Sequence, residues 1–164
     1  MKKSIVSKLA VVCLTAGVVA IGGVSAPASA KSKGYVFKYK GVSVTMNGAA
    51  KKLIKKAGKP SKKTVKKSCA YKGKDRTYTY KDFQLKTYSK TNNGAEYVSE
   101  IRFRSNKAVT KEGIRIGSSL KDVTKKYGKA KARFGVYTFK KGSSKLQIML
   151  NGNKVSAIRY FASK

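Results

Sequence analysis

Short stretches of alternating hydrophobic and polar residues recur along the chain from Tyr35 onward. In residues 35–40 aromatic side chains alternate with valine and lysine, and in residues 83–88 and 145–150 apolar residues or threonine occupy every second position. A period of two places successive side chains on opposite faces of a strand. These segments therefore predict β-strands with one buried face. Asn151-Gly152-Asn153 predicts a hairpin turn leading into a last strand over residues 155–160.

Two further segments have the helical period instead. The apolar positions are Ala50, Leu53, Ile54 and Ala57 in the first, and Leu120, Val123 and Tyr127 in the second. Ser119 followed by Asp122 three residues later is a capping signature, and Gly128 is a typical helix end. The first helix is expected to stop at Gly58-Lys59-Pro60. Both helices should turn their apolar stripe toward the sheet.

Four short motifs occur twice in the same order. Val98-Ser99-Glu100-Ile101-Arg102-Phe103 matches residues 155–160, and the other matches join residues 41–44 to 113–116, 55–59 to 125–129, and 78–81 to 137–140. Collinear matches of this kind are the signature of an internal repeat. The spacing shortens from 72 and 70 residues to 59 and 57, which predicts an insertion between Gly58 and Tyr78 in the first copy.

The predicted fold class is therefore α+β, with two tandem β-α-β-β-β units, an antiparallel sheet and short helices packed on one face. Each unit should begin with a short strand, at residues 41–44 and 113–116. We place the units at residues 35–105 and 106–164, after a linker at 31–34. The lysine-rich insertion of the first unit is expected to be a mobile loop.

The first thirty residues have the three parts of a secretory signal peptide. A basic start ending at Lys8 precedes an uncharged stretch over residues 9–24, and Ala28-Ser29-Ala30 is a typical cleavage site. The apolar run is shorter than the roughly 20 residues that span a bilayer, so we expect cleavage, export and no transmembrane segment afterwards. Removal of residues 1–30 leaves 36 basic residues against 6 acidic ones, a net charge of +30. The expected localisation is extracellular or cell-wall associated.

Composition argues against an enzyme. The chain has no His, so a His-activated nucleophile or an imidazole zinc site is excluded. Neither a P-loop nor a dinucleotide-binding glycine motif occurs. Cys69 is the only Cys after the signal and cannot form an internal disulfide; we expect it to be buried near a strand start. No catalytic residue, metal site or cofactor is predicted.

Lysine is the strongest chemical signal in the sequence. Between residues 51 and 67 there is no acidic residue, and the predicted anion-binding residues are Lys51, Lys52, Lys55, Lys56, Lys59, Lys62, Lys63, Lys66 and Lys67. Only six of the 36 basic residues after the signal are Arg. Lysine is a hydrated point charge, whereas Arg makes forked contacts, so this surface suits a repeating phosphate polymer recognised by charge density. Solvation of a basic protein would produce the same pattern without a partner.

The order of motifs in residues 35–162 resembles the tandem units of the beta-lactamase inhibitory protein fold. It is also similar to single-unit envelope lipoproteins of the SmpA/OmlA type. The residues that carry the resemblance are the opening at 113–119 with Val123 and Tyr127-Gly128. Residues 68–75 with Tyr78-Thr79-Tyr80 further resemble small secreted proteins of Gram-positive bacteria with no settled function. In the inhibitor, the sheet faces form a concave surface that holds a protein partner.

Three functions remain open from sequence. The leading one is a secreted, non-enzymatic envelope module held by charge to anionic cell-wall polymer. The alternative that the resemblance implies is a protein-binding module that uses the solvent-facing sheet, with candidate residues Lys86, Tyr88, Arg102, Arg104, Gln147 and Arg159. An extracellular nucleic-acid binder is a further and less favoured alternative. Membrane insertion is also less favoured, because the lysine-rich helix turns its small apolar stripe to the core and lacks large exposed anchors.

Overall fold

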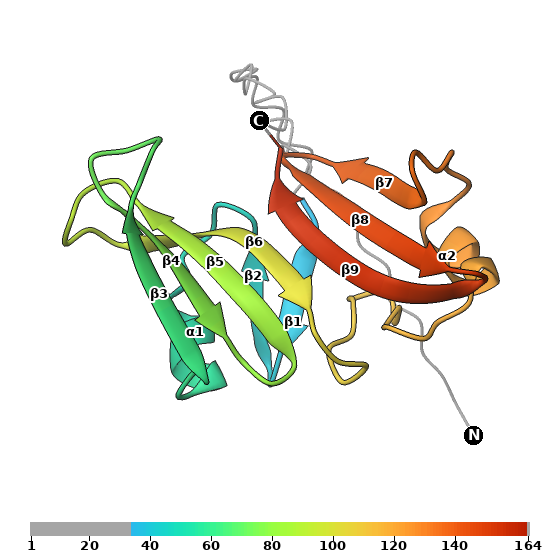
Figure 1. Cartoon of the computed structure of the whole chain (residues 1–164), viewed down its shortest axis with the longest axis horizontal. Helices are drawn as coiled ribbons and strands as arrows, with labels where there is room; N and C mark the ends of the chain where they lie inside the picture. Colours follow the sequence, from blue (N-terminus) through green and yellow to red (C-terminus); the bar gives the residue numbers. More distant parts are fainter. Residues whose placement is uncertain (1–33, 164) are drawn as a thin grey trace, which may run out of the picture.

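A computed structural model describes residues 34–163, so the predicted signal peptide lies outside the described residues. The elements are β1 (Val36–Tyr39), β2 (Val42–Thr45), α1 (Lys51–Ala57), β3 (Lys62–Lys67), β4 (Lys74–Thr79), β5 (Phe83–Ser89), β6 (Glu96–Phe103), α2 (Leu120–Tyr127), β7 (Val136–Lys141), β8 (Ser144–Asn151) and β9 (Lys154–Ala162). The two helices lie at opposite ends of the molecule (Figure 1). The broad α+β class is confirmed, with strands dominating.

Seven of the strands form one antiparallel sheet in the order β3-β4-β5-β6-β9-β8-β7, and β1 and β2 form a separate hairpin. Strands β6 and β9 meet at the middle of the large sheet, where Arg102 is the register partner of Arg159. On either side of this pair the hairpin order is mirrored, with β5 and β4 outward from β6 and β8 and β7 outward from β9. β3 extends one edge only.

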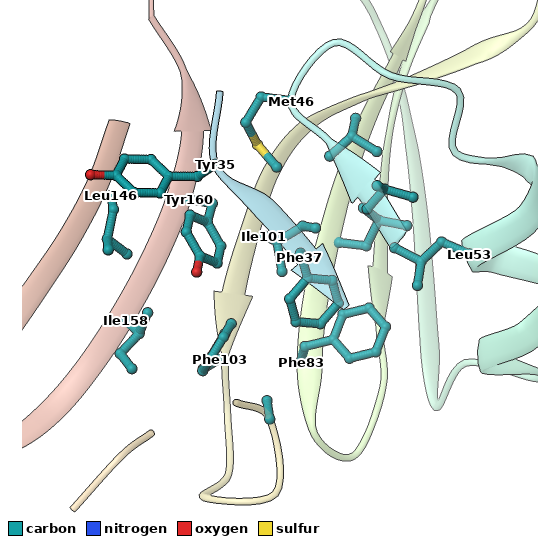
Figure 2. Close-up of a cluster of buried hydrophobic side chains, with 14 of the residues drawn as sticks. Tyr35, Phe37, Met46, Leu53, Phe83, Ile101, Phe103, Leu146, Ile158 and Tyr160 are labelled. Atoms are coloured by element: carbon teal, nitrogen blue, oxygen red, sulfur yellow. The ribbon is translucent and has the colours of Figure 1, made fainter. Parts of the chain in front are cut away.

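The core lies on one face of the large sheet, as the alternation in β5 and β8 predicts. Phe83, Leu85, Leu146 and Ile148 have no exposed surface. The β1–β2 hairpin covers the middle of this face, where the Phe37 ring lies 5.2 Å from that of Phe83. Figure 2 shows the aromatic and aliphatic side chains of β1, β5, β6, β8 and β9 meeting in a single cluster. We call the opposite surface of the sheet the open face.

Both helices pack on the buried face of the sheet. Leu53 of α1 and Val123 of α2 are almost completely buried, and the Tyr127 ring of α2 contacts Phe139 of β7 at 5.3 Å. The predicted capping box is present, since Ser119 Oγ accepts from the Asp122 amide at 3.1 Å and the carboxylate accepts from the Ser119 amide. These helix predictions are confirmed, including the ends at Gly58 and Gly128.

Two local predictions are wrong. Residues 113–116 are irregular chain that leads into a turn rather than a strand, because Gly117, with a φ angle of 93°, ends the extended stretch where β2 continues to Thr45. The segment between Gly58 and Tyr78 is not a loop, because residues 62–67 form β3 by pairing with β4 along their whole length. Four strands therefore follow α1, whereas three follow α2.

Candidate anion-binding surface

The nine predicted lysines surround the β3 edge of the sheet, and all nine are exposed. Lys51, Lys52, Lys55 and Lys56 lie on α1, on the surface turned away from buried Leu53. Lys59 follows the helix, and the remaining four lie on β3. Figure 1 shows α1 beside β3 at this end of the molecule. The stretch is therefore gathered at one end of the fold, although its members do not share one face.

Strand register distributes the β3 lysines over both sides of the sheet. Lys63 is opposite Tyr78, whose side chain is on the buried face, and its Nζ lies 5.3 Å from the centre of the Tyr78 ring. Lys62 and Lys66 are one residue out of phase with Lys63 and Lys67, so they lie on the open-face side. Lysines along an edge strand also discourage the pairing of a further strand. The β3 edge thus presents positive charge in all accessible directions.

A basic cleft lies at the end of β3. It has a volume of about 420 Å³ and is lined by Val65, Lys66, Lys67, Lys72, Lys74 and Asn92. No acidic residue lines it. Lys72, Lys74 and Asn92 come from the β3–β4 loop, β4 and the β5–β6 loop, so sequence analysis missed them. In the sequence, Lys72 and Lys74 could have been connected with the cleft only through their position in or next to the turn at residues 68–73.

Hydrogen bonds fix the loop that forms one wall of the basic cleft. Ser89, which is completely buried in β5, accepts through Oγ from the Lys74 amide at 3.0 Å and from Arg76 Nη1 at 3.2 Å. The Ser68 amide donates to the Gly73 carbonyl at 3.0 Å and closes the loop. Gly73 passes so close to β5 that a Cβ there would overlap the Ser89 carbonyl. The cleft lysines are therefore carried on a loop whose backbone is held in place.

Gly73→Ala is expected to destabilise the fold by about 1–3 kcal/mol, because the added methyl group must displace either the loop or the Ser89 backbone. Urea unfolding measures this free energy. Ala70→Ser, at an exposed position of the same loop, is the control and should change stability by less than about 0.5 kcal/mol. Equal stability of the two variants would show that Gly73 does not hold the loop.

The acidic residues do not neutralise these lysines. All six lie within the described residues, and the carboxylates of five accept hydrogen bonds or form ion pairs elsewhere; these five are Asp82, Glu96, Glu100, Glu112 and Asp122. Asp75 is exposed and is the register partner of Lys66 on β3, but no ion pair joins the two side chains. None of the nine lysines forms an ion pair with a carboxylate in the part of the chain that the structure describes.

Glu96 illustrates how the carboxylates are used. It accepts from Tyr78 Oη at 2.9 Å and from Thr87 Oγ1 at 2.7 Å, and its other oxygen lies 3.5 Å from Arg76 Nε. Burial, together with the hydrogen bond to Glu96, raises the pKa of Tyr78 above its ordinary value, so this hydroxyl remains a donor. The carboxylate therefore serves the internal packing of β4, β5 and β6, and the lysine-rich end keeps its positive charge.

The open face carries a second cluster of charges. Five of its six predicted residues lie there, on four strands: Lys86, Tyr88, Arg102, Gln147 and Arg159. The sixth, Arg104, is exposed one residue beyond the end of β6, where its Nη1 donates to the Tyr80 carbonyl at 3.0 Å.

Glu100 is at the centre of this open-face cluster. Its carboxylate lies 3.4 Å from Lys86 Nζ, 3.8 Å from Arg102 Nε and 3.9 Å from Arg159 Nη1. The Arg159 guanidinium also stacks 4.5 Å from the Phe161 ring. Nearby, a hollow of about 510 Å³ is lined by residues that include Lys86 and the stacked rings of Tyr71 and Tyr88. One carboxylate thus holds three cations over the central strands.

Cys69 is exposed in the β3–β4 loop, so the prediction of a buried Cys at a strand start is wrong. The surrounding loop lies outside the core, and residue type alone did not show this. No group of three or more potential metal ligands occurs among residues 34–163. In the same residues, no helix is long and apolar enough to cross a membrane.

Comparisons of the chain with protein-family models, with curated proteins and with solved structures return no match. The resemblance to the beta-lactamase inhibitory protein fold therefore stays a prediction from the sequence motifs.

Proposed function

We propose that the chain is an exported, non-enzymatic module that binds anionic cell-wall polymer through the lysines around β3. One observation carries the proposal: none of these lysines forms an ion pair with a carboxylate in the described chain, and five of the six acidic residues are occupied elsewhere, Asp75 opposite Lys66 being the exception. Unpaired charge at this density repels itself and is best accommodated by a polyanion. Export of the chain rests on the N-terminal residues 1–30, and a phosphate-rich wall polymer is the nearest such polyanion.

The basic cleft is proposed as the centre of the binding surface. Lys66, Lys67, Lys72 and Lys74 converge there from β3, the loop and β4. The lysines of α1 and the remaining ones of β3 would extend the contact along a flexible chain of phosphates. Lysine recognises phosphate as a point charge without fixed geometry, so binding should depend on charge density rather than on the stereochemistry of the polymer.

The test is retention on purified cell walls, with and without their phosphate polymer. Residues 31–164 contain the whole described fold and omit the predicted signal peptide. A cleft variant replaces Lys66, Lys67, Lys72 and Lys74 with Gln, and a control variant replaces four exposed lysines outside the cleft, Lys38, Lys107, Lys111 and Lys140. Both variants lose four charges. The cleft variant should lose about tenfold or more in affinity, given up to about 1 kcal/mol for each exposed charge contact, and the control distinctly less.

Equal losses in the two variants would mean that net charge alone causes retention and that the cleft has no special part in it. Retention that survives removal of the phosphate polymer would contradict the proposal altogether. Competition by single-stranded DNA at equal phosphate concentration would place nucleic acid among the ligands. Circular dichroism of each variant checks that the fold is intact.

A second candidate, a protein-binding module that uses the open face, is favoured by the cluster around Glu100. The repeated V-S-x-I-R-aromatic motif lies on β6 and β9, and its two arginines face each other as register partners.

We propose on this basis that the halves of the sheet are tandem units related by an approximate twofold axis, with β3 as the insertion. If the lysines bind wall polymer, replacing Arg102 and Arg159 with Gln should leave retention on cell walls unchanged. If a protein occupies the open face, the same replacement should weaken the binding of that protein.

A further inference from the structure

A phenylalanine at the tip of the loop between α2 and β7 does not pack in the core. Phe134 is 97% exposed, the highest value among the large hydrophobic residues of the described chain. It precedes β7, which is the sheet edge opposite β3. Figure 1 shows this loop, in orange, at the opposite end of the molecule from β3. Neither the core nor the basic cleft involves Phe134.

The backbone holds Phe134 in this exposed position. Arg133 and Val136 exchange two hydrogen bonds of 3.1 and 3.0 Å, so Phe134 and Gly135 form a tight two-residue turn. Their φ angles are 50° and 72°, which is the backbone geometry of a type I′ turn, where Asn-Gly is preferred. A bulky residue with positive φ is an outlier. Among residues 34–163 a second pair with positive φ angles, Lys40-Gly41, has an exposed lysine at the same position.

Local stability therefore does not explain a phenylalanine at position 134. Strained backbone positions cluster at functional sites. A strained residue that is also exposed and apolar therefore suggests a function for Phe134. The turn also has apolar neighbours, because Val136, two residues further on, is the register partner of Met149, which is 45% exposed. Val136 and Met149 line a hollow on the open face together with Arg102 and Arg159. We call Phe134, Val136 and Met149, which lie near one another along the ends of β7 and β8, the apolar corner.

Basic residues flank the apolar corner. Lys129, Lys131 and Arg133 are exposed and precede Phe134 at alternate positions in the same loop. Residues 123–164 contain no acidic residue. An aromatic side chain that enters the acyl boundary, surrounded by lysine and arginine that bind anionic headgroups, is the pattern of peripheral membrane association. A pocket on another protein would also accept Phe134, but such a pocket would not require that only basic residues flank it.

We propose that the apolar corner, with Phe134 as its anchor, docks onto the surface of an anionic phospholipid bilayer. This association is peripheral and adds to the proposed polymer binding rather than replacing it. Six strand spacings separate β7 from β3, about 30 Å along the sheet. The lipid-binding and polymer-binding residues are thus far enough apart to be altered independently.

Binding of residues 31–164 to vesicles tests the proposal without the predicted signal peptide, whose apolar run would itself bind lipid. The protein should sediment with vesicles of phosphatidylcholine mixed with phosphatidylglycerol and not with phosphatidylcholine alone. Phe134→Asn suits the turn better and should keep the fold intact, yet it should reduce vesicle binding about tenfold or more. Replacing Lys129, Lys131 and Arg133 with Gln should reduce it about 100-fold together.

The chain has no Trp, so Phe134→Trp places its single tryptophan at the anchor, and the emission of that tryptophan can be excited separately from that of the ten tyrosines. Its emission should shift to shorter wavelength with the mixed vesicles and be quenched by brominated lipid. Tyr71→Trp, at the cleft end of the molecule, is the matched control and should show neither effect. A wild-type protein that does not sediment, or a Phe134→Asn variant that binds as well as wild type, would overturn the proposal.

The lipid and polymer proposals fail separately. Phe134→Asn should leave retention on cell walls unchanged, whereas the cleft variant should leave the fluorescence shift of the Trp probe unchanged. A blue shift of the Trp probe with wall polymer in the absence of lipid would show that the corner binds polymer, and it would overturn lipid docking. If the cleft variant loses vesicle binding and the Phe134→Asn variant keeps it, lipid binds at the basic cleft and not at Phe134, which would also overturn the proposal.

Discussion

Leu53→Asp should prevent the chain from folding. Leu53 is fully buried in α1, a helix of only seven residues that has no side-chain N-cap. Replacing a buried Leu with a much smaller side chain destabilises by about 2–5 kcal/mol, and the new carboxylate would be buried without a cationic partner, which costs several kcal/mol more. The sum is comparable with the whole stability of a domain, about 5–15 kcal/mol.

Lys55→Asp is the matched control, because it introduces the same residue on the exposed side of the same helix. An acidic residue in the last turn opposes the helix dipole, so a loss of up to about 1 kcal/mol is expected. Val123→Asp makes the corresponding test in α2, where Val123 is 1% exposed. Near-ultraviolet circular dichroism and urea unfolding measure the outcome. If all three variants unfold at the same urea concentration, the helices do not face the core as described.

The helices and the inner strands could be predicted because local and tertiary preferences agree there. The capping box at Ser119 and Asp122 fixes the start of α2 by hydrogen bonds within three residues. In β5 every second side chain is buried, as the alternation from Phe83 indicates. These signals are contained in a few neighbouring residues, so they do not depend on knowledge of the rest of the chain.

β3 could not be predicted in the same way. Its sequence, Lys-Lys-Thr-Val-Lys-Lys, has one apolar residue, and Val65 is 48% exposed. The strand forms because β4 supplies a hydrogen-bonding partner, which is a tertiary effect. Residues 113–116 show the opposite case: their pattern matches that of β2, but Gly117 has a positive φ angle and no strand of the described chain pairs with the segment as β1 pairs with β2.

The candidate site was predicted in part for similar reasons. A run of lysines is visible in the sequence, and exposure of such residues is the rule. The basic cleft depends on three segments that the fold brings together, among them Asn92 from a loop before β6. The exposure of Phe134 was not foreseen, because an aromatic residue beside a strand normally indicates core. Only the geometry of the Arg133–Val136 turn shows that its side chain has nothing to pack against.

Affinity for wall polymer should fall linearly on a plot of the logarithm of the binding constant against the logarithm of salt concentration. Phosphate contacts release condensed counterions, and the slope reports their number. If the lysines around β3 make six to ten contacts, affinity should drop on the order of 10³–10⁵-fold between about 50 and 200 mM salt on the scale of duplex DNA, and less for a flexible single chain. Sedimentation on purified walls across a salt series measures the slope.

The same series separates direct contact from general attraction. Each lysine that touches a phosphate contributes about 0.7 to the slope on a single-stranded polyanion, so the cleft variant should be shallower by up to about 3. The control variant carries the same net charge but lacks none of the cleft lysines, and its slope should stay near that of the wild-type protein. If affinity does not respond to salt, charge density does not cause retention. Binding should then be sought on the open face, where loss of Arg102 and Arg159 would have the larger effect because Glu100 holds both beside Lys86.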